Sequence, residues 1–273
     1  MCIRDSIAHP GKRILEAKQR ILFQLGTQAF ANTQFEQAIG YFDRSLGLGQ
    51  YNRQTKADAL YWRGEAYYRL NRMEEAKRNF TDYLQLTQQT HNEMYALAHY
   101  NLGYIAFHQK DYTQAQNWFR KYISLEKGEN KTALADAYNR IGDCYLDVRN
   151  FDEAKHYYSQ AEAMNTPSGD YSFYQLALVS GLQKDYSGKI TLLNRLAGKY
   201  PASPYAISAL YEKGRSYVLM DNNQQAIASF KELLAKYPES PVSRKAAAEI
   251  GLLYYQNEDY DQAINAYKQV VQK

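Results

Sequence analysis

The sequence predicts an all-α fold, specifically a right-handed α-solenoid built from antiparallel helix pairs. Only six prolines and fifteen glycines interrupt the 273 residues, and the Val and Ile runs typical of strands are missing. A glycine, an alanine twelve residues later and a large aromatic residue sixteen residues later recur along the chain. Short polar breaks such as QKDYTQA, RNFDEA and NEDYDQA split each repeat into two helical halves. A pair of this size can bury its apolar surface only by stacking on its neighbours, which makes a solenoid.

Seven repeats fill the chain, at offsets of 38, 39, 39, 35, 37 and 37 residues. Six carry the glycine, whereas the degenerate fifth repeat has Ala177 in its place and Lys189 in the alanine position. We expect one array over residues 14–273, after a non-repeat segment 1–13 whose first six residues, MCIRDS, resemble a translated sequencing-adapter remnant. The repeats are expected near residues 19–48, 57–88, 96–127, 135–164, 170–200, 207–238 and 244–273.

Helical spacing explains the pattern inside each repeat. In the first helix of the second repeat, called helix A, Leu60, Gly64 and Tyr67 are spaced i, i+4 and i+7 and therefore share one face. Ala76 and Phe80 share a face of the following helix B in the same way. We expect the glycine of A and the alanine of B to mark the close contact, with aromatic rings beside it. The recurring Asp-Tyr and Asn-Phe pairs at the breaks indicate turns and helix caps.

The motifs NLGYIA, RIGDCYL and EIGLLYY, followed by YTQAQNWFRKY, FDEAKHYYSQA and YDQAINAYKQV, resemble the tetratricopeptide repeat (TPR) family. The resemblance covers residues 14–273 and implies a TPR-like superhelix. The joins KYPASP and KYPESP, which contain Pro201 and Pro238, resemble those of bacterial envelope members. The repeats exceed the family's usual length of about 34 residues, which predicts longer helices or longer joins such as GLGQYNRQTKAD. The substitutions in the fifth repeat predict a loosely packed hairpin or a bend.

The sequence carries no Gly-rich phosphate loop, His-Glu-x-x-His helix or Gly-x-Ser-x-Gly elbow. We therefore expect a protein that is not an enzyme and needs no cofactor. The two cysteines, Cys2 and Cys144, indicate neither a disulfide framework nor a thiol metal site, and Cys144 falls at a helix A position expected to be buried. His99 and His108 are nine residues apart and cannot share a helix face at ligand distance, so no metal site is expected.

Charge and hydropathy narrow the range of partners and compartments. The 33 basic and 29 acidic residues give a net charge of +4 without long blocks of one sign, which argues against nucleic acid as a partner. No apolar run reaches the ~20 residues that span a bilayer, so direct membrane insertion is not expected. The start, MCIRDSIAHPGKR, lacks the apolar centre of a signal peptide. This predicts a cytoplasmic protein if the N-terminus is complete, and a periplasmic or cell-envelope protein if an export signal was lost.

Tyrosine is unusually frequent, at 27 residues, and many tyrosines recur on helix A about one residue away from the packing face. In repeats of this family helix A lines the concave groove, so the resemblance implies a tyrosine-lined groove. Tyrosine offers a large, rigid contact area and a hydroxyl at a small entropy cost, which favours its use in recognition. The expected groove residues are Tyr61, Tyr68, Tyr100, Tyr104, Phe107, Asn139, Asp143, Tyr174, Tyr211, Arg215 and Tyr255.

These residues favour a scaffold for protein–protein interaction that holds an extended peptide or a partner helix in the groove. The structural alternative is that the rings only pack against one another. A clamp for a C-terminal carboxylate, as in chaperone-binding family members, is not supported because its slots hold Phe23, Thr27 and Trp62. Two functional alternatives remain open, namely the sensory or docking arm of a larger enzyme or signalling protein, and a glycan-binding groove. The partner's identity and the oligomeric state are not predicted.

Overall fold

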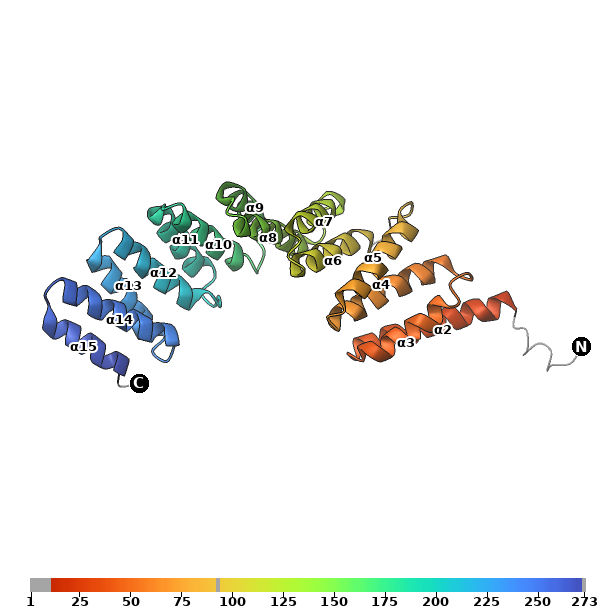
Figure 1. Ribbon diagram of the computed structural model, residues 1–273, viewed down its shortest axis with the longest axis horizontal. Helices are drawn as coiled ribbons and strands as arrows, with labels where there is room; N and C mark the ends of the chain where they lie inside the picture. The colour runs from red at the N-terminus through yellow and green to blue at the C-terminus, as the bar shows by residue number, and fades with distance from the viewer. Residues whose placement is uncertain (1–10, 92–93, 272–273) are drawn as a thin grey trace, which may run out of the picture. The chain divides into compact units, whose positions relative to one another are not determined.

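The computed structural model describes residues 11–91 and 94–271. Within them, fourteen α-helices pair in chain order into seven hairpins (Figure 1). The predicted all-α solenoid of helix pairs is confirmed, and none of the described helices is long and apolar enough to cross a membrane. The A helices are α2 (Lys12–Ala31), α4 (Arg53–Arg69), α6 (Met94–His108), α8 (Lys131–Asp147), α10 (Asp170–Leu182), α12 (Ala206–Leu219) and α14 (Pro241–Gln256). The B helices are α3 (Phe35–Leu46), α5 (Met73–Thr87), α7 (Tyr112–Leu125), α9 (Phe151–Ala163), α11 (Tyr186–Lys199), α13 (Asn223–Lys236) and α15 (Tyr260–Val271).

The hairpins fall into two compact units, divided between Lys127 and Gly128. Unit 1 holds α2 to α7 and unit 2 holds α8 to α15. Within each unit, every helix B packs against the helix A that follows it. Gly128 has a φ of 86°, a backbone conformation that glycine adopts without the steric cost a side chain would add. The repeat spacing predicts a single array and does not mark this boundary.

Most A helices begin earlier than the repeat pattern predicts. Helices α4 and α8 start at Arg53 and Lys131, against the predicted repeat starts near 57 and 135, and each is 17 residues long. The side chain of Asn52 caps α4 by accepting a hydrogen bond from the amide of Thr55, and Asn130 caps α8 in the same way. The extra length of the repeats therefore lies partly in helix A, including half of the segment GLGQYNRQTKAD. Helix α2 likewise starts inside the predicted non-repeat segment, of which residues 1–10 lie outside the described residues.

The recurring glycine makes room for an aromatic ring rather than for the alanine. A Cβ atom placed on Gly103 would lie 2.8 Å from the ring of Phe119, and one placed on Gly142 would lie 2.7 Å from the ring of Tyr158. The nearest side chain to such a Cβ is the ring sixteen residues later in all six glycine-bearing hairpins. The expected glycine–alanine contact is thus wrong in detail. The aromatic ring lies against the glycine of helix A, and the alanine four residues before the ring is also buried.

The turns between helices A and B share one backbone geometry that their residue types do not predict. Each has a non-glycine residue in the left-handed region, with φ between 57° and 63°, two residues before helix B begins. In five of the seven, the next residue is an Asp or Asn whose side chain accepts a hydrogen bond from the helix B backbone, which confirms the predicted capping. The residues with positive φ are Thr33, Asn71, Lys110, Arg149, Lys184, Asp221 and Glu258.

The degenerate fifth hairpin accommodates a buried cation. Lys189 is 6% exposed, and its ammonium donates a hydrogen bond to Glu212 on α12. Gly181 on α10 provides the space, because a Cβ atom there would lie 2.9 Å from Cδ of Lys189. The lysine therefore links its own hairpin to the next one by an ion pair, where the other hairpins bury a small alanine.

Cys144 on α8 is free and buried, as the register predicts. Burial, with a smaller contribution from the nearby carboxylate of Asp143, raises the pKa of its thiol to about 12. Because the thiolate is the reactive form, we expect native protein with Cys2→Ser to react with Ellman's reagent at least about a hundredfold more slowly than unfolded protein. Rapid labelling of one thiol in native protein, with helicity unchanged, would show that α8 opens readily or that the thiol is not buried.

Candidate functional site

The A-helix position three residues before the glycine carries a ring in most hairpins, and this ring also packs inside its own hairpin. In four hairpins its centroid lies 5.5–6.0 Å from the buried ring sixteen residues after the glycine. One face of each ring is therefore used for packing, so only what remains exposed is available to a partner. The pairs are Phe23–Phe42, Tyr61–Phe80, Tyr100–Phe119 and Tyr211–Phe230.

In unit 1, a polar contact joins α4 to α6. The side-chain amide of Asn101 donates a hydrogen bond to the carboxylate of Glu65 and another, at 3.3 Å, to the hydroxyl of Tyr61. Burial raises the pKa of Glu65, although Arg69 and the two hydrogen-bonding groups act to lower it. Tyr61 is only 6% exposed, so its ring belongs to the hairpin interior and is left out of the surface discussed below.

A second contact between the same two helices lies one turn further along. The Tyr68 hydroxyl and Nε2 of His108 are 3.1 Å apart, and the Tyr104 ring lies 6.3 Å from the His108 ring. Tyr100 packs edge-on against Tyr104, at 5.1 Å between centroids. The structure thus brings Tyr68, Tyr100 and Tyr104 into one half-buried aromatic row. The predicted Phe107 instead contacts Tyr112, at the turn into α7.

In unit 2, Asp143 on α8 is the centre of a half-buried polar cluster. It accepts hydrogen bonds from the hydroxyls of Tyr158 and Tyr171, each at 2.7 Å, and pairs with Nη1 of Arg140 at 2.6 Å. The Arg140 guanidinium also lies 4.9 Å from the centre of the Tyr171 ring. Burial raises the pKa of Asp143, and its effect exceeds the lowering by Arg140 and the two hydroxyls. The predicted Asn139 is only 5% exposed and accepts a hydrogen bond from Ser172, so it too joins α8 to α10 in the interior.

The aromatic contacts continue from α10 to the start of α12. Tyr205, at the N-terminal end of α12, lies 6.0 Å from the Tyr171 ring and stacks on Tyr174 at 4.9 Å with an interplanar angle of 14°. Burial raises the pKa of Tyr171, Tyr174 and Tyr205. All three tyrosines should therefore remain uncharged at neutral pH and act as hydroxyl-bearing rings.

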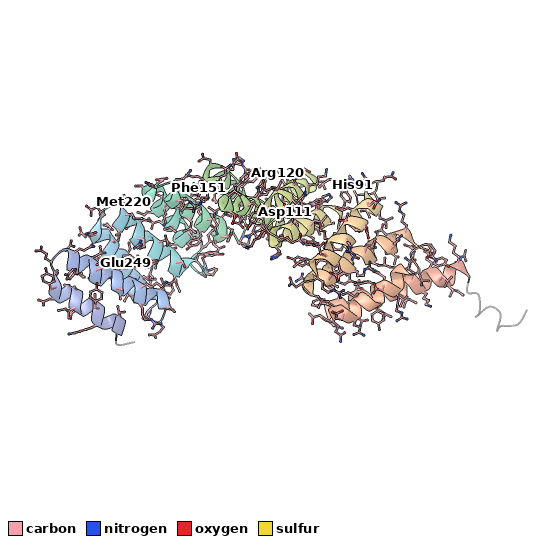
Figure 2. All side chains as sticks on the ribbon, in the orientation of Figure 1. His91, Asp111, Arg120, Phe151, Met220 and Glu249 are labelled. Atoms are coloured by element: carbon pink, nitrogen blue, oxygen red, sulfur yellow. The ribbon has the colours of Figure 1, made fainter. Side chains whose placement is uncertain are left out.

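Helices α12 and α14 are joined through Glu249, which Figure 2 labels on α14. Its carboxylate accepts a hydrogen bond from the Tyr211 hydroxyl at 3.2 Å and from Nη1 of Arg215 at 2.9 Å. The Arg215 side chain remains 43% exposed. Tyr255, at the end of α14, is 58% exposed, and its ring lies 5.7 Å from the ring of Tyr260. We call Asp143, Tyr171, Tyr174, Tyr205, Tyr211, Arg215 and Glu249 the A-helix row of unit 2.

The predicted positions omitted several residues of these clusters. Asn101, Arg140 and Glu249 all lie two residues before the recurring glycine, whereas the prediction used the positions three before, one after and four after it. That slot is polar in most repeats, and its polarity is the signal that could have revealed it. Tyr171 and Tyr205 have no such signal, because they lie near the N-terminal ends of their helices. No group of residues that could hold a metal ion occurs in the described part of the chain.

Models of the tetratricopeptide repeat match residues 23–89, 93–166, 139–204 and 211–273. The chain belongs to the tetratricopeptide repeat family. The uncharacterized protein ycf37 of Guillardia theta is 40% identical over 62 residues, which cover 23% of this chain and 35% of that protein. The TPR chain therefore aligns with only about a third of that curated relative's length.

Solved structures share the fold at low sequence identity. The C-terminal part of a TPR protein from Cytophaga hutchinsonii is 20% identical, with a TM-score of 0.75 over 91% of this chain and 94% of that one. The TPR sensor-containing signal transduction ATPase of Pyrococcus horikoshii is 18% identical, with a TM-score of 0.71 over 96% of this chain and 43% of that one. PilF of Pseudomonas aeruginosa is 16% identical, with a TM-score of 0.60 over 86% and 99%. TPR repeats generally mediate protein–protein interaction, and proteins built from them are generally non-catalytic scaffolds.

Proposed function

We propose that this TPR protein is a non-catalytic scaffold that holds an extended peptide or a partner's helix against the A helices. The observation that carries the proposal is the A-helix row of unit 2, in which aromatic rings and charged groups follow one another across four neighbouring A helices. Its rings supply contact area, and the half-exposed Arg215 beside Glu249 can select the charge of the partner. In unit 1, Tyr68, Tyr100 and Tyr104 form the corresponding set.

The packing contacts of these rings make a specific test necessary. Random linear peptides displayed on phage would be selected on the wild-type protein, and the affinity of the selected peptides measured by fluorescence anisotropy. We expect either Tyr100→Ala with Tyr104→Ala, or Tyr174→Ala with Arg215→Ala, to weaken binding about tenfold or more. Gln160→Ala, an exposed change on α9, should leave the affinity within about twofold.

Circular dichroism of the double variants shows whether a loss of binding comes from lost contacts with the peptide or from unfolding. If helicity and melting stay near those of the wild type, the rings contact the peptide. If the double variants lose helicity in step with binding, the rings serve packing alone and the proposal fails. Unchanged affinity in both double variants would equally contradict it.

A second candidate function is the sensory arm of a larger signalling protein, favoured by the similarity to a signal transduction ATPase with a TPR sensor. In that case the same A-helix surface would receive the signal, and an output domain would lie elsewhere in the gene. The full open reading frame, read from genomic DNA, distinguishes the two candidates. A glycan in the groove would instead be indicated by selective binding on a carbohydrate array that excess peptide does not reduce.

A further inference from the structure

A solvent-open hollow of about 630 Å³ lies between α13, α14 and α15 of unit 2 (Figure 1 labels the three helices). Its buried lining consists of the apolar residues Ala247, Ile250 and Ala266 together with Ser243, whose hydroxyl donates a hydrogen bond to the carbonyl of Tyr237. None of the A-helix row residues lines it. The hollow is therefore a separate feature from the surface proposed above.

The repeat register explains why the hollow exists. Ala247 lies four residues before the recurring glycine and Ala266 fifteen residues after it. In the third hairpin these two positions hold His99 and Trp118, whose rings are in contact with centroids 5.6 Å apart. In the fourth hairpin they hold Tyr138 and Tyr157, with centroids 6.3 Å apart. Where these two hairpins place two rings in contact, α14 and α15 provide two methyl groups. The hollow lined by Trp118 in the third hairpin is accordingly smaller, at about 240 Å³.

The first of these positions is large in every other hairpin. It holds Leu22, Leu60, His99, Tyr138, Phe173 and Leu210, against Ala247 in the last hairpin. The vacant volume thus has the size of side chains that the fold accommodates at the same place in other repeats. A bulky apolar side chain from another molecule can enter it without displacing the backbone.

Charge around the opening is positive. Lys231 on α13 and Arg244 on α14 line the hollow, and none of its described lining residues is acidic. The Lys231 ammonium donates one hydrogen bond to the Tyr254 hydroxyl at 2.9 Å, which leaves further donors on the same nitrogen. An apolar group that enters here is therefore best accompanied by a carboxylate.

Two carboxamide side chains in the lining indicate which ligand supplies the apolar group and the carboxylate. They favour a peptide over a free fatty acid. Gln262 and Asn265 both line the hollow from α15, and a spacing of three residues places them on one helix face. A carboxamide can donate a hydrogen bond to a peptide group and accept one from it, whereas a hydrocarbon chain forms no hydrogen bonds. The hollow thus combines an apolar cavity, two cations and two groups suited to a peptide backbone.

We propose that this hollow binds a linear peptide segment of a partner protein in which a large aromatic side chain is flanked by acidic residues. The ring occupies the space between Ala247 and Ala266. The acidic side chains lie near Lys231 and Arg244, and the backbone pairs with Gln262 and Asn265. This site is independent of the A-helix row and adds a second point of attachment for the same or another partner.

The test uses a fluorescein-labelled peptide, blocked at both ends, with phenylalanine between two aspartates in a glycine-serine frame. Two matched peptides replace both aspartates by lysine, or the phenylalanine by alanine. We expect the acidic aromatic peptide to bind about tenfold or more tightly than either matched peptide, as measured by fluorescence anisotropy. Ala266→Trp, which introduces the residue found at this position in the third hairpin, and Arg244→Glu should each reduce that binding about tenfold.

The controls separate a specific loss from misfolding and from other ligands. Lys245→Glu changes an exposed cation next to Arg244 that does not line the hollow, and should leave affinity within about twofold. Ala266→Trp should keep wild-type helicity, because the fold carries a tryptophan in the same slot of α7. Equal binding of the acidic and basic peptides, or binding unchanged by Ala266→Trp, would overturn the proposal. Tight binding of a long-chain fatty acid that displaces the peptide would assign the hollow to a lipid instead. Arg215→Ala should have no effect, so failure here leaves the scaffold proposal intact.

Discussion

Phe230→Ala is expected to destabilise unit 2 by about 3–5 kcal/mol, the range for truncating a fully buried aromatic side chain. Phe230 has no exposed surface and lies against Gly214 of its own hairpin. Its cluster includes Ile250 of the following helix A, so the ring joins two hairpins. Its removal leaves a cavity that the closely packed helix backbones cannot fill.

Tyr267→Ala is the matched control, because Tyr267 occupies the same position in the last hairpin. Its ring also lies over a glycine, Gly251, but it is 39% exposed. We expect its truncation to cost about 1–2 kcal/mol, since much of the ring is already in water. If both substitutions cost the same free energy of unfolding, the ring at this position would not owe its larger contribution to burial by the next hairpin.

Amide hydrogen exchange of peptides from α12 to α14 is the appropriate measurement. A protein of two units and stacked repeats need not unfold in one step, so a single melting temperature would mix several transitions. Phe230→Ala should reduce protection in these helices and leave protection in α4 and α5 of unit 1 unchanged. A uniform loss of protection over both units would indicate that the chain unfolds as one cooperative body.

The repeat register is what made the fold predictable from sequence. Because one pattern recurs seven times, a single helical-wheel argument placed Gly64, Ala76 and Phe80 on the buried faces, where the structure has them. The equivalent positions of the other hairpins are buried too, except Tyr267 in the last one, which is 39% exposed. The division at Gly128 escaped the same argument, since the repeat offset there is an ordinary 39 residues. The repeat pattern also did not predict the positive φ of residues such as Thr33, because most of these positions hold residue types that rarely adopt it.

The candidate site was only partly predictable, because side-chain burial on helix A depends on the neighbouring helices. Helical spacing could not show that Tyr61 and Asn139 are covered, or that Tyr68 packs against the same core cluster as Tyr67. Pairs such as Asn101 with Glu65, or Arg215 with Glu249, join residues 36 and 34 positions apart. Which slot of one helix reaches which slot of the next depends on the stacking angle between hairpins, and the sequence pattern does not contain that angle.

Arg140→Ala is expected to destabilise unit 2 by about 2 kcal/mol at neutral pH, somewhat less than the ~3–5 kcal/mol found for fully buried pairs. The side chains of Arg140 and Asp143 are 19% and 12% exposed, so water screens them little. Removal of the guanidinium leaves the Asp143 carboxylate hydrogen-bonded to the neutral hydroxyls of Tyr158 and Tyr171, without the cation beside it. Truncation also removes the contact of Arg140 with the Tyr171 ring.

The pH dependence of that loss has a definite sign. Burial already raises the pKa of Asp143 above the ordinary 3.8, so its contribution to stability is fully present below that value and is lost as the pH rises through the folded-state pKa. Arg140 lowers this pKa, and its removal raises it further. The cost of Arg140→Ala should therefore be smaller at about pH 4 than at about pH 7. The Asp143→Asn background lacks the carboxylate closest to Arg140 and keeps the more exposed Asp136 carboxylate, 3.5 Å from Nε of Arg140. In that background the same substitution should cost under about 1 kcal/mol at either pH. Protection of α8 and α10 against hydrogen exchange is measured in the wild type, the two single variants and the double variant. If the cost of Arg140→Ala changed neither with pH nor with Asp143→Asn, Arg140 would stabilise the unit through packing rather than charge.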